Sequence, residues 1–121
     1  MRKRSFLSSM LVVASLLATG CSAGGEQPAS DATADVGKRL YENRCASCHG
    51  ADGAGDTPMG GGGVTANLKD GQWTYGGNPR DIERSISEGI PGTAMRGFKS
   101  QMTPDEIGQL AAHVKSFEGQ K

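Results

Sequence analysis

The segment Cys45-Ala46-Ser47-Cys48-His49 constrains this chain of 121 residues more than any other part of it. A Cys-x-x-Cys-His sequence is the attachment site of c-type haem. Two thiols three positions apart lie on one helical turn, where each can add to one vinyl group of the same porphyrin. The histidine after the second thiol then lies under the iron as its proximal ligand. We therefore predict a covalently attached haem c, bound through Cys45 and Cys48 and ligated by His49.

Two other chemistries use the same residues. A thiol redox protein would use Cys45 and Cys48 as a dithiol, but thioredoxin-like proteins need a βαβ context that this chain lacks. A zinc site would combine Cys45, Cys48 and His49 with His113. The sequence has no second closely spaced ligand pair, however, and adjacent Cys48 and His49 are poorly placed around one tetrahedral ion. Both stay as weaker alternatives to haem.

The first twenty residues have the form of a secretory signal. The basic start Arg2–Arg4 precedes a largely apolar run, Phe6–Ala18, which is shorter than the roughly 20 residues of a membrane-spanning helix. The run ends at Leu-Ala-Thr-Gly-Cys21 and resembles the lipobox of bacterial lipoproteins, whose cysteine becomes the N-terminus and carries lipid. That resemblance implies a protein of the bacterial cell envelope, on the periplasmic side, lipid-anchored to a membrane through Cys21. The alternative is an ordinary cleaved signal that leaves Cys21 as a free thiol.

Charge and length limit the partners and the number of domains. Residues 1–20 carry three of the 13 Lys and Arg residues and none of the 13 Asp and Glu residues, so the rest of the chain has a net charge of about −3. This argues against a nucleic-acid partner, which requires a basic surface. We expect a lipoprotein-type signal peptide over 1–20, a flexible linker with the lipid-anchor cysteine over 21–34, and one domain over 35–121.

The first helix of the domain should end in the haem sequence. It is expected to run from about Asp35 into Cys48, because Val36, Leu40 and Tyr41 recur at helical spacing. The long segment over 50–77 is rich in glycine and is expected to be mostly loop. No part of the chain alternates apolar and polar residues for long enough to predict a strand.

Two further helices have recognisable ends. Asn78-Pro79 should begin the middle helix and Gly89 should end it. Thr103-Pro104-Asp105-Glu106 has an N-cap, a proline at the first helical position and a capping-box glutamate, and so should begin the last helix. The residues expected to face the core are Ile82 and Ile86 in the middle helix, and Ile107, Leu110, Ala111, Val114 and Phe117 at the C-terminal end.

The order of these segments resembles that of the class I cytochromes c, over roughly Asp35 to Phe117. The shared parts are the haem helix, the glycine-rich run after it, Gly-Gln-Trp-Thr-Tyr-Gly-Gly at 71–77, and Gly-Ile-Pro-Gly-Thr-Ala-Met at 89–95. The likeness is closest to the small bacterial cytochrome c domains that accompany terminal oxidases. It implies an all-α class I cytochrome c fold, with about three main helices and long glycine-rich loops around one covalent haem.

In that family a methionine thioether is the distal axial ligand, and Met95 stands at the matching place, 46 residues after His49. The residues themselves agree, because Met95 follows the middle helix in a loop of proline and glycine that can bring a sulfur across the ring. Met59, Met102 and His113 are the weaker candidates. The resemblance therefore implies that His49 and Met95 are the two iron ligands.

Further residues are matched only through the resemblance. The family often turns side-chain donors toward a haem propionate, and Trp73, Tyr75 and Arg80 are the matching donors here. Plain core packing is the alternative for Trp73. The family also often has a proline whose carbonyl orients the proximal histidine. This chain has Thr-Ala-Asn-Leu over 65–68 at that place, so the residue that supplies the carbonyl stays open.

The function follows from the ligands. Histidine and methionine together fill both axial positions and leave no site for a substrate. We therefore expect an electron carrier, not an enzyme, that passes single electrons between membrane-associated redox proteins of a respiratory chain. Its donor or acceptor could be a terminal oxidase or a dehydrogenase. The alternative is a haem-based gas or redox sensor, or a small peroxidase, whose sixth ligand is labile.

Overall fold

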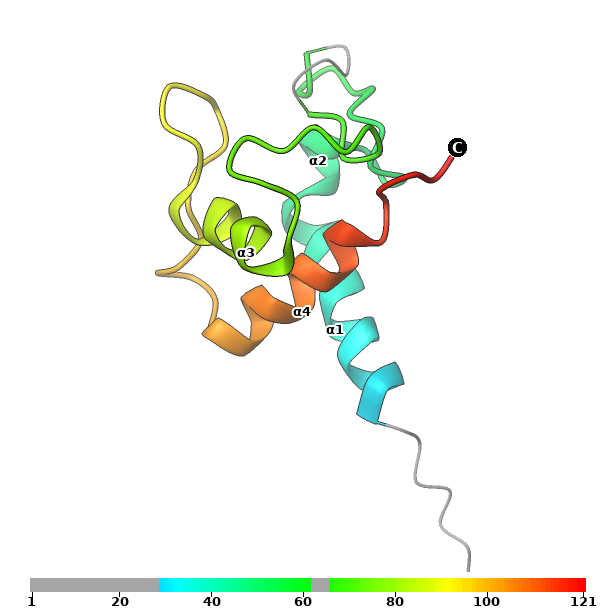
Figure 1. Cartoon of the computed structure of the whole chain (residues 1–121), viewed down its shortest axis with the longest axis vertical. Coiled ribbons are helices and arrows are strands. Elements are labelled where there is room, and N and C mark those ends of the chain that lie inside the picture. The colour runs from blue at the N-terminus through cyan, green and yellow to red at the C-terminus, as the bar shows by residue number, and fades with distance from the viewer. Residues whose placement is uncertain (1–28, 62–65) are drawn as a thin grey trace, which may run out of the picture.

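A computed structural model describes residues 29–61 and 66–121 of the chain. Within them are the helices α1 (Ala29–Arg44), α2 (Ala46–His49), α3 (Pro79–Glu88) and α4 (Pro104–Lys115), joined by irregular segments (Figure 1). This described part has no β-strand, and a single antiparallel bridge pairs Gly89 with Arg96. None of its helices combines the length and the apolar content needed to span a bilayer. The predicted all-α architecture is confirmed.

Helix α1 begins earlier than the sequence pattern predicts. Its first residue is Ala29, not Asp35, so the last six residues of the expected linker are helical. Alanine has the highest helix propensity, and Asp31 in the first turn is favourable at the positive end of the helix dipole. The carboxylate of Asp35 also lies 3.0 Å from the guanidinium of Arg39, one turn later. The predicted signal peptide, Cys21 and residues 21–28 of the expected linker lie outside the described residues.

The first helix is also interrupted before the haem sequence ends. Helix α1 stops at Arg44, and the short helix α2 follows after Cys45, whose backbone has φ −117° and ψ −37°. The hydrogen bonds continue across the break, because the N–H of Cys45 donates to the carbonyl of Tyr41 at 2.8 Å and that of His49 to the carbonyl of Cys45 at 2.9 Å. The predicted continuous helix is therefore two helical segments in series.

Helices α3 and α4 begin as predicted. The side chain of Asn78 accepts a hydrogen bond from the N–H of Asp81, and the left-handed φ of Gly89 (75°) ends α3. Thr103 and Glu106 form the reciprocal capping box at the start of α4. Both helices have a proline in their first turn, where a missing N–H costs nothing. The expected core-facing side chains of both helices are buried.

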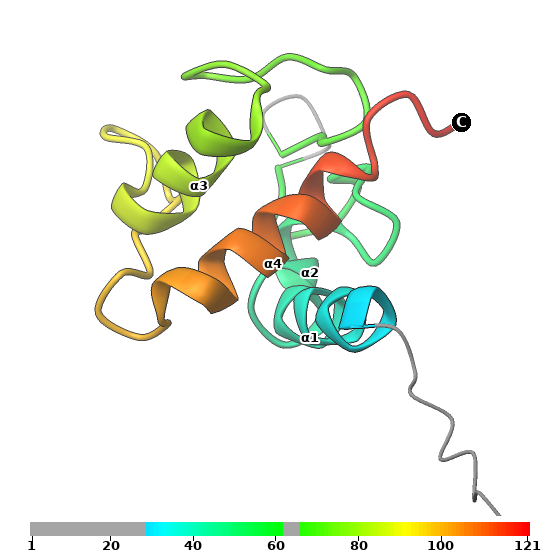
Figure 2. The same cartoon turned by 60° about the horizontal axis from the view of Figure 1, so that its bottom comes forward.

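Helix α4 lies across α1 and also packs against α3 (Figures 1 and 2). The crossing with α1 is close because α1 has Gly37 at that point. A Cβ atom built there would lie 2.3 Å from the carbonyl oxygen of Gln109 in α4. The first and the last helix of the described part are thereby packed together, and α2 itself packs only against α1 among these helices.

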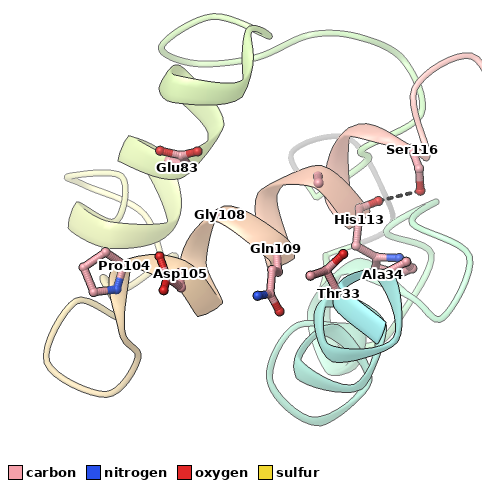
Figure 3. Close-up of a pocket in the computed structure, with 10 residues that line it drawn as sticks. Thr33, Ala34, Glu83, Pro104, Asp105, Gly108, Gln109, His113 and Ser116 are labelled. Atoms are coloured by element: carbon pink, nitrogen blue, oxygen red, sulfur yellow. Dashed lines mark hydrogen bonds between the residues drawn. The ribbon is translucent and has the colours of Figure 1, made fainter. Parts of the chain in front are cut away.

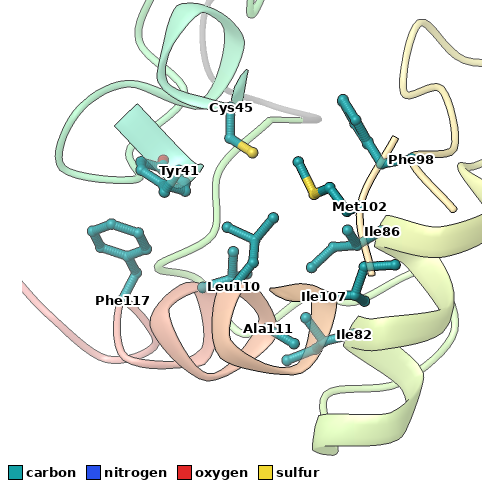
Figure 4. Close-up of a cluster of buried hydrophobic side chains, with 11 residues drawn as sticks. Tyr41, Cys45, Ile82, Ile86, Phe98, Met102, Ile107, Leu110, Ala111 and Phe117 are labelled. Atoms are coloured by element: carbon teal, nitrogen blue, oxygen red, sulfur yellow. The ribbon is translucent and has the colours of Figure 1, made fainter. Parts of the chain in front are cut away.

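One cluster of apolar side chains fills the space between these helices (Figure 4). Tyr41, Ile82 and Leu110 are fully buried at its centre. The cluster also includes Cys45, the first thiol of the haem sequence, which is 8% exposed. The remaining members are Ile86, Phe98, Met102, Ile107, Ala111, Val114 and Phe117.

Candidate haem-binding site

The two thiols of the Cys-x-x-Cys-His sequence lie at the junction of α1 and α2, and both are free. Cys45 is buried and Cys48 is partly exposed. Figure 4 shows the sulfur of Cys45 turned toward the side chain of Met102 in the core. Burial, and next the nearby Cys48, raise the pKa of the Cys45 thiol to about 11. One sulfur therefore belongs to the apolar core and the other to the partly exposed side of the same helical turn.

His49, at the end of α2, has one ring nitrogen committed to the backbone. Its Nδ1 lies 2.7 Å from the carbonyl oxygen of Ala66. A carbonyl only accepts, so the proton of the neutral imidazole is on Nδ1 and the lone pair is on Nε2. This is the tautomer and orientation that a metal-ligating histidine requires. The open question of which residue supplies the carbonyl is answered: Ala66 does, at the place where the resembling family often has a proline.

The carbonyl of Ala66 is held by the loop that follows His49. The N–H of Gly55 donates to the carbonyl of His49 at 2.7 Å, and the N–H of Leu68 donates to the carbonyl of Gly53 at 2.8 Å. Gly55 approaches so closely that a Cβ there would lie 2.6 Å from the carbonyl carbon of Ala66. The described glycines of this loop thus allow the two backbone segments to touch.

Met95 lies in a loop that is tied to the end of α3. Its carbonyl accepts from the N–H of Ile90 at 2.9 Å, and its N–H donates to Oγ1 of Thr93 at 3.1 Å. Downstream, the N–H of Phe98 donates to the carbonyl of Ile86 at 2.9 Å. The side chain of Met95 is partly buried and packs against the core cluster. The loop conformation is therefore fixed on both sides of the methionine.

The weaker candidates for the sixth ligand have other surroundings. Met59 is 70% exposed, and Met102 is buried in the core cluster. The ring of His113 packs edge-on against Tyr41 at 5.2 Å and Phe117 at 5.0 Å between ring centroids. These contacts give His113 a packing role in a cluster of aromatic rings.

Trp73 and Tyr75 have protein partners. The indole Nε1–H of Trp73 donates to Oε2 of Glu118 at 3.2 Å, while its ring packs against the core. The guanidinium of Arg84 lies 4.7 Å from the ring centre of Tyr75. The third matched donor, Arg80, is exposed. Sequence reasoning missed Glu118, which is 45 positions from Trp73 and has no motif that distinguishes it from other surface glutamates.

The donor set fits a covalently bound haem. Two free thiols lie one helical turn apart, and the adjacent imidazole has its Nε2 lone pair available. The first thiol and the candidate methionine both border the same apolar cluster. Cys45, Cys48, His49 and Met95 are the residues that would hold the group.

A separate groove of about 750 Å³ lies between the start of α1, α3 and α4 (Figure 3). It is lined by residues that include Glu83, Asp105, Gln109 and His113. None of the cysteine, histidine or methionine residues assigned to haem lines it. The groove is therefore distinct from the candidate haem site.

Known proteins resemble this chain over most of the described part. The family model described as cytochrome c oxidase, cbb3-type, subunit III, matches residues 32–114. The chain is 35% identical over 99 residues to the cbb3-type cytochrome c oxidase subunit CcoP of Rhodobacter capsulatus, covering 77% of this chain and 32% of that protein. It is 32% identical over 98 residues to the subunit FixP of Azorhizobium caulinodans, covering 81% of this chain and 32% of that protein. The chain spans about a third of the length of these relatives.

Solved structures of c-type cytochromes have a similar arrangement. The c-type cytochrome KustC0563 superposes with a TM-score of 0.58 at 34% identity, covering 68% of this chain and 96% of that one. Cytochrome cL of Methylophaga aminisulfidivorans superposes with a TM-score of 0.60 at 26% identity, covering 73% of this chain and 57% of that one.

Proposed function

Because the chain belongs to the family of cytochrome c oxidase, cbb3-type, subunit III, we propose that it carries single electrons on one haem c whose iron is ligated by His49 and Met95. The class I cytochrome c fold and the covalent haem predicted from the sequence are confirmed by the family and the solved neighbours. When bound, the haem supplies an iron that alternates between the ferrous and ferric states. The chain's own residues attach it, orient it and exclude water.

The observation that carries the proposal is the 2.7 Å hydrogen bond from Nδ1 of His49 to the carbonyl of Ala66. It fixes the ring beside two free thiols and leaves Nε2 as an electron-pair donor. A hydrogen bond of this kind also makes the imidazole a stronger donor to iron. An imidazole held in this way would be available to ligate the iron in both oxidation states, as electron transfer requires.

Met95 is proposed as the distal ligand. It lies in a loop whose backbone is bonded to the end of α3 on both sides of the methionine, and its side chain already borders the core. A fixed loop keeps the sulfur from exchanging with water or with small ligands. The chain then has no open iron position, and we propose that it transfers electrons without converting a substrate.

The partners and location are proposed from the relatives. The curated relatives are subunits of a terminal oxidase, so a membrane-associated redox donor and an oxidase-type acceptor are the expected partners. The lipobox-like end at Cys21 supports a lipid anchor on the periplasmic side of the envelope. The intact mass of the mature protein from the membrane fraction tests the anchor, and a mass without acyl chains would exclude it.

The test of the carrier function is the visible spectrum of protein matured with the c-haem assembly machinery, recorded oxidised, reduced, and reduced with carbon monoxide. A low-spin spectrum that carbon monoxide leaves unchanged is expected from two firm protein ligands. A high-spin spectrum, or rapid carbon monoxide binding, would contradict the proposal and favour a sensor or a peroxidase.

A further inference from the structure

The carbonyl that orients His49 belongs to a segment without regular secondary structure. Ala66 begins a described stretch that has no helix or strand before α3 starts at Pro79. Two residues after Ala66, the N–H of Leu68 donates to the carbonyl of Gly53 in the loop after His49. The position of the Ala66 oxygen therefore depends on contacts that fix this stretch from outside.

The C-terminal residues after α4 provide such contacts. The N–H of Gly119 donates to the carbonyl of Lys69 at 3.0 Å. One residue earlier, the carboxylate of Glu118 accepts the indole N–H of Trp73 at 3.2 Å. The chain end thus bonds to the 66–73 stretch at two points, one through backbone and one through side chains.

The carboxylate of Glu118 is held in place by a second donor. The ammonium of Lys115, on the last turn of α4, also donates to Oε2 of Glu118. The pKa of Glu118 is lowered, mainly by this bond from Lys115 and further by the bond from Trp73. Glu118 is therefore ionised at neutral pH and makes charge-assisted hydrogen bonds, which are stronger than neutral ones.

The residue before Glu118 connects the same chain end to the loop after His49. Phe117 is buried, and its ring packs directly against Gly53. A Cβ atom built on Gly53 would lie 2.7 Å from Cγ of Phe117. Gly53 in turn accepts the N–H of Leu68. The hydrogen bond between His49 and Ala66 joins the loop after His49 to the 66–73 stretch. Both of these segments thus contact residues 117–119.

We propose that Glu118 is a positioning residue for the proximal histidine. Glu118 accepts a hydrogen bond from Trp73 and so holds the 66–73 stretch against the end of α4. We call this Glu118–Trp73 contact the clamp. It keeps the Ala66 carbonyl within hydrogen-bond distance of Nδ1 of His49. The inference rests on the proposed function, because it assigns His49 to the iron. It also assigns the indole N–H of Trp73 to Glu118, where the family resemblance implied a haem propionate.

The test compares Glu118→Ala and Trp73→Phe with Asp35→Ala in the haem-loaded protein. Asp35 is an exposed carboxylate with an ion pair on α1, so its replacement removes the same charge far from the clamp. A weaker bond to Ala66 makes the imidazole a poorer electron donor, which disfavours ferric iron. Both clamp variants should therefore raise the midpoint potential more than Asp35→Ala does, although Trp73→Phe changes no charge.

Proton exchange at His49 provides the second readout. The Nδ1–H resonance should exchange with solvent several-fold faster in both clamp variants than in Asp35→Ala. The double variant should exchange no faster than either single variant, because both remove one interaction. Unchanged exchange and potential, or additive effects in the double variant, would overturn the clamp.

Failure of the clamp is distinguishable from failure of the proposed function. If the wild-type protein has a low-spin haem that excludes carbon monoxide, and the clamp variants match the control, only the clamp is refuted. If the wild-type haem is not ligated by His49, both are refuted.

Discussion

Gly37 of α1 lies directly against the backbone of Gln109 in α4, so that a Cβ at Gly37 would be 2.3 Å from the Gln109 carbonyl oxygen. No side chain fits at this distance without moving one helix. The crossing joins the first helix of the described part to the last one.

Replacing Gly37 with alanine should destabilise the protein by about 1–3 kcal/mol, because overpacking at a helix crossing outweighs the better helix propensity of alanine. Urea unfolding of the haem-loaded protein measures this. Gly108→Ala in α4 is the matched control, since its Cβ would meet only Oε1 of Glu83 at 3.7 Å. That change should be neutral or stabilising by up to about 1 kcal/mol. Equal effects at the two positions would contradict the tight crossing.

Tyr41→Phe should cost about 0.5–1.5 kcal/mol of unfolding free energy. The buried hydroxyl of Tyr41 donates to the carbonyl of Gly50 at 2.6 Å. The cost stays moderate because the N–H of Gly53 still bonds to the same oxygen at 3.2 Å. Tyr75→Phe, in a partly buried ring beside Arg84, is the control and should change stability by less than about 0.5 kcal/mol. A Tyr41→Phe protein as stable as the control would exclude a contribution from this hydrogen bond.

His113 should make stability decrease in mild acid. Burial and then Lys38 lower its pKa below the ordinary value of 6.5, with Glu42 acting in the opposite direction. Below pH 6.5 the unfolded chain binds a proton at this residue that the folded chain resists binding. Stability is therefore full above pH 6.5 and is lost as the pH falls toward the lowered pKa.

Thermal unfolding at pH 7.5 and 5.5 measures the His113 effect. His113→Phe keeps an aromatic ring against Tyr41 and Phe117 and removes the titration, so its melting temperature should differ less between the two pH values. A variant with the same pH dependence as the wild type would assign the effect to other groups.

Met95→Ala should open the iron to carbon monoxide and lower the reduction potential, because the thioether favours ferrous iron. Met102→Leu is the control, since Met102 is buried in the core. This volume-conserving change should leave ligand exclusion intact and cost less than about 1.5 kcal/mol. If Met95→Ala still excludes carbon monoxide, another residue is the distal ligand.

The sequence predicted those parts of the fold whose signals are local. The caps at Asn78 and Thr103 are side chains that bond within the first turn of their own helix. The sequence alone therefore predicts where α3 and α4 start. It does not predict where α1 starts, because the first residues of that helix have helix propensity without apolar periodicity. The break at Cys45 has no side-chain cap and leaves no local signal.

The partners of the site residues were harder to predict than the residues themselves. Any residue offers a carbonyl, so nothing in the side chain of Ala66 identifies it as the acceptor for His49. The partner of Trp73 depends on where the chain end returns after α4. The proposed iron ligands, by contrast, are specialised side chains in a fixed order along the chain. A sequence pattern can therefore predict them.

The early start of α1 has a mechanical consequence. Sixteen helical residues at about 1.5 Å each form a helix about 24 Å long, and the side chains of residues 31–35 are exposed. A helix holds its two ends at one distance, whereas an irregular segment of the same number of residues allows many end-to-end distances. The start of α1 is therefore held at a fixed distance from Cys45, and a partner that contacts both has to span the length of α1.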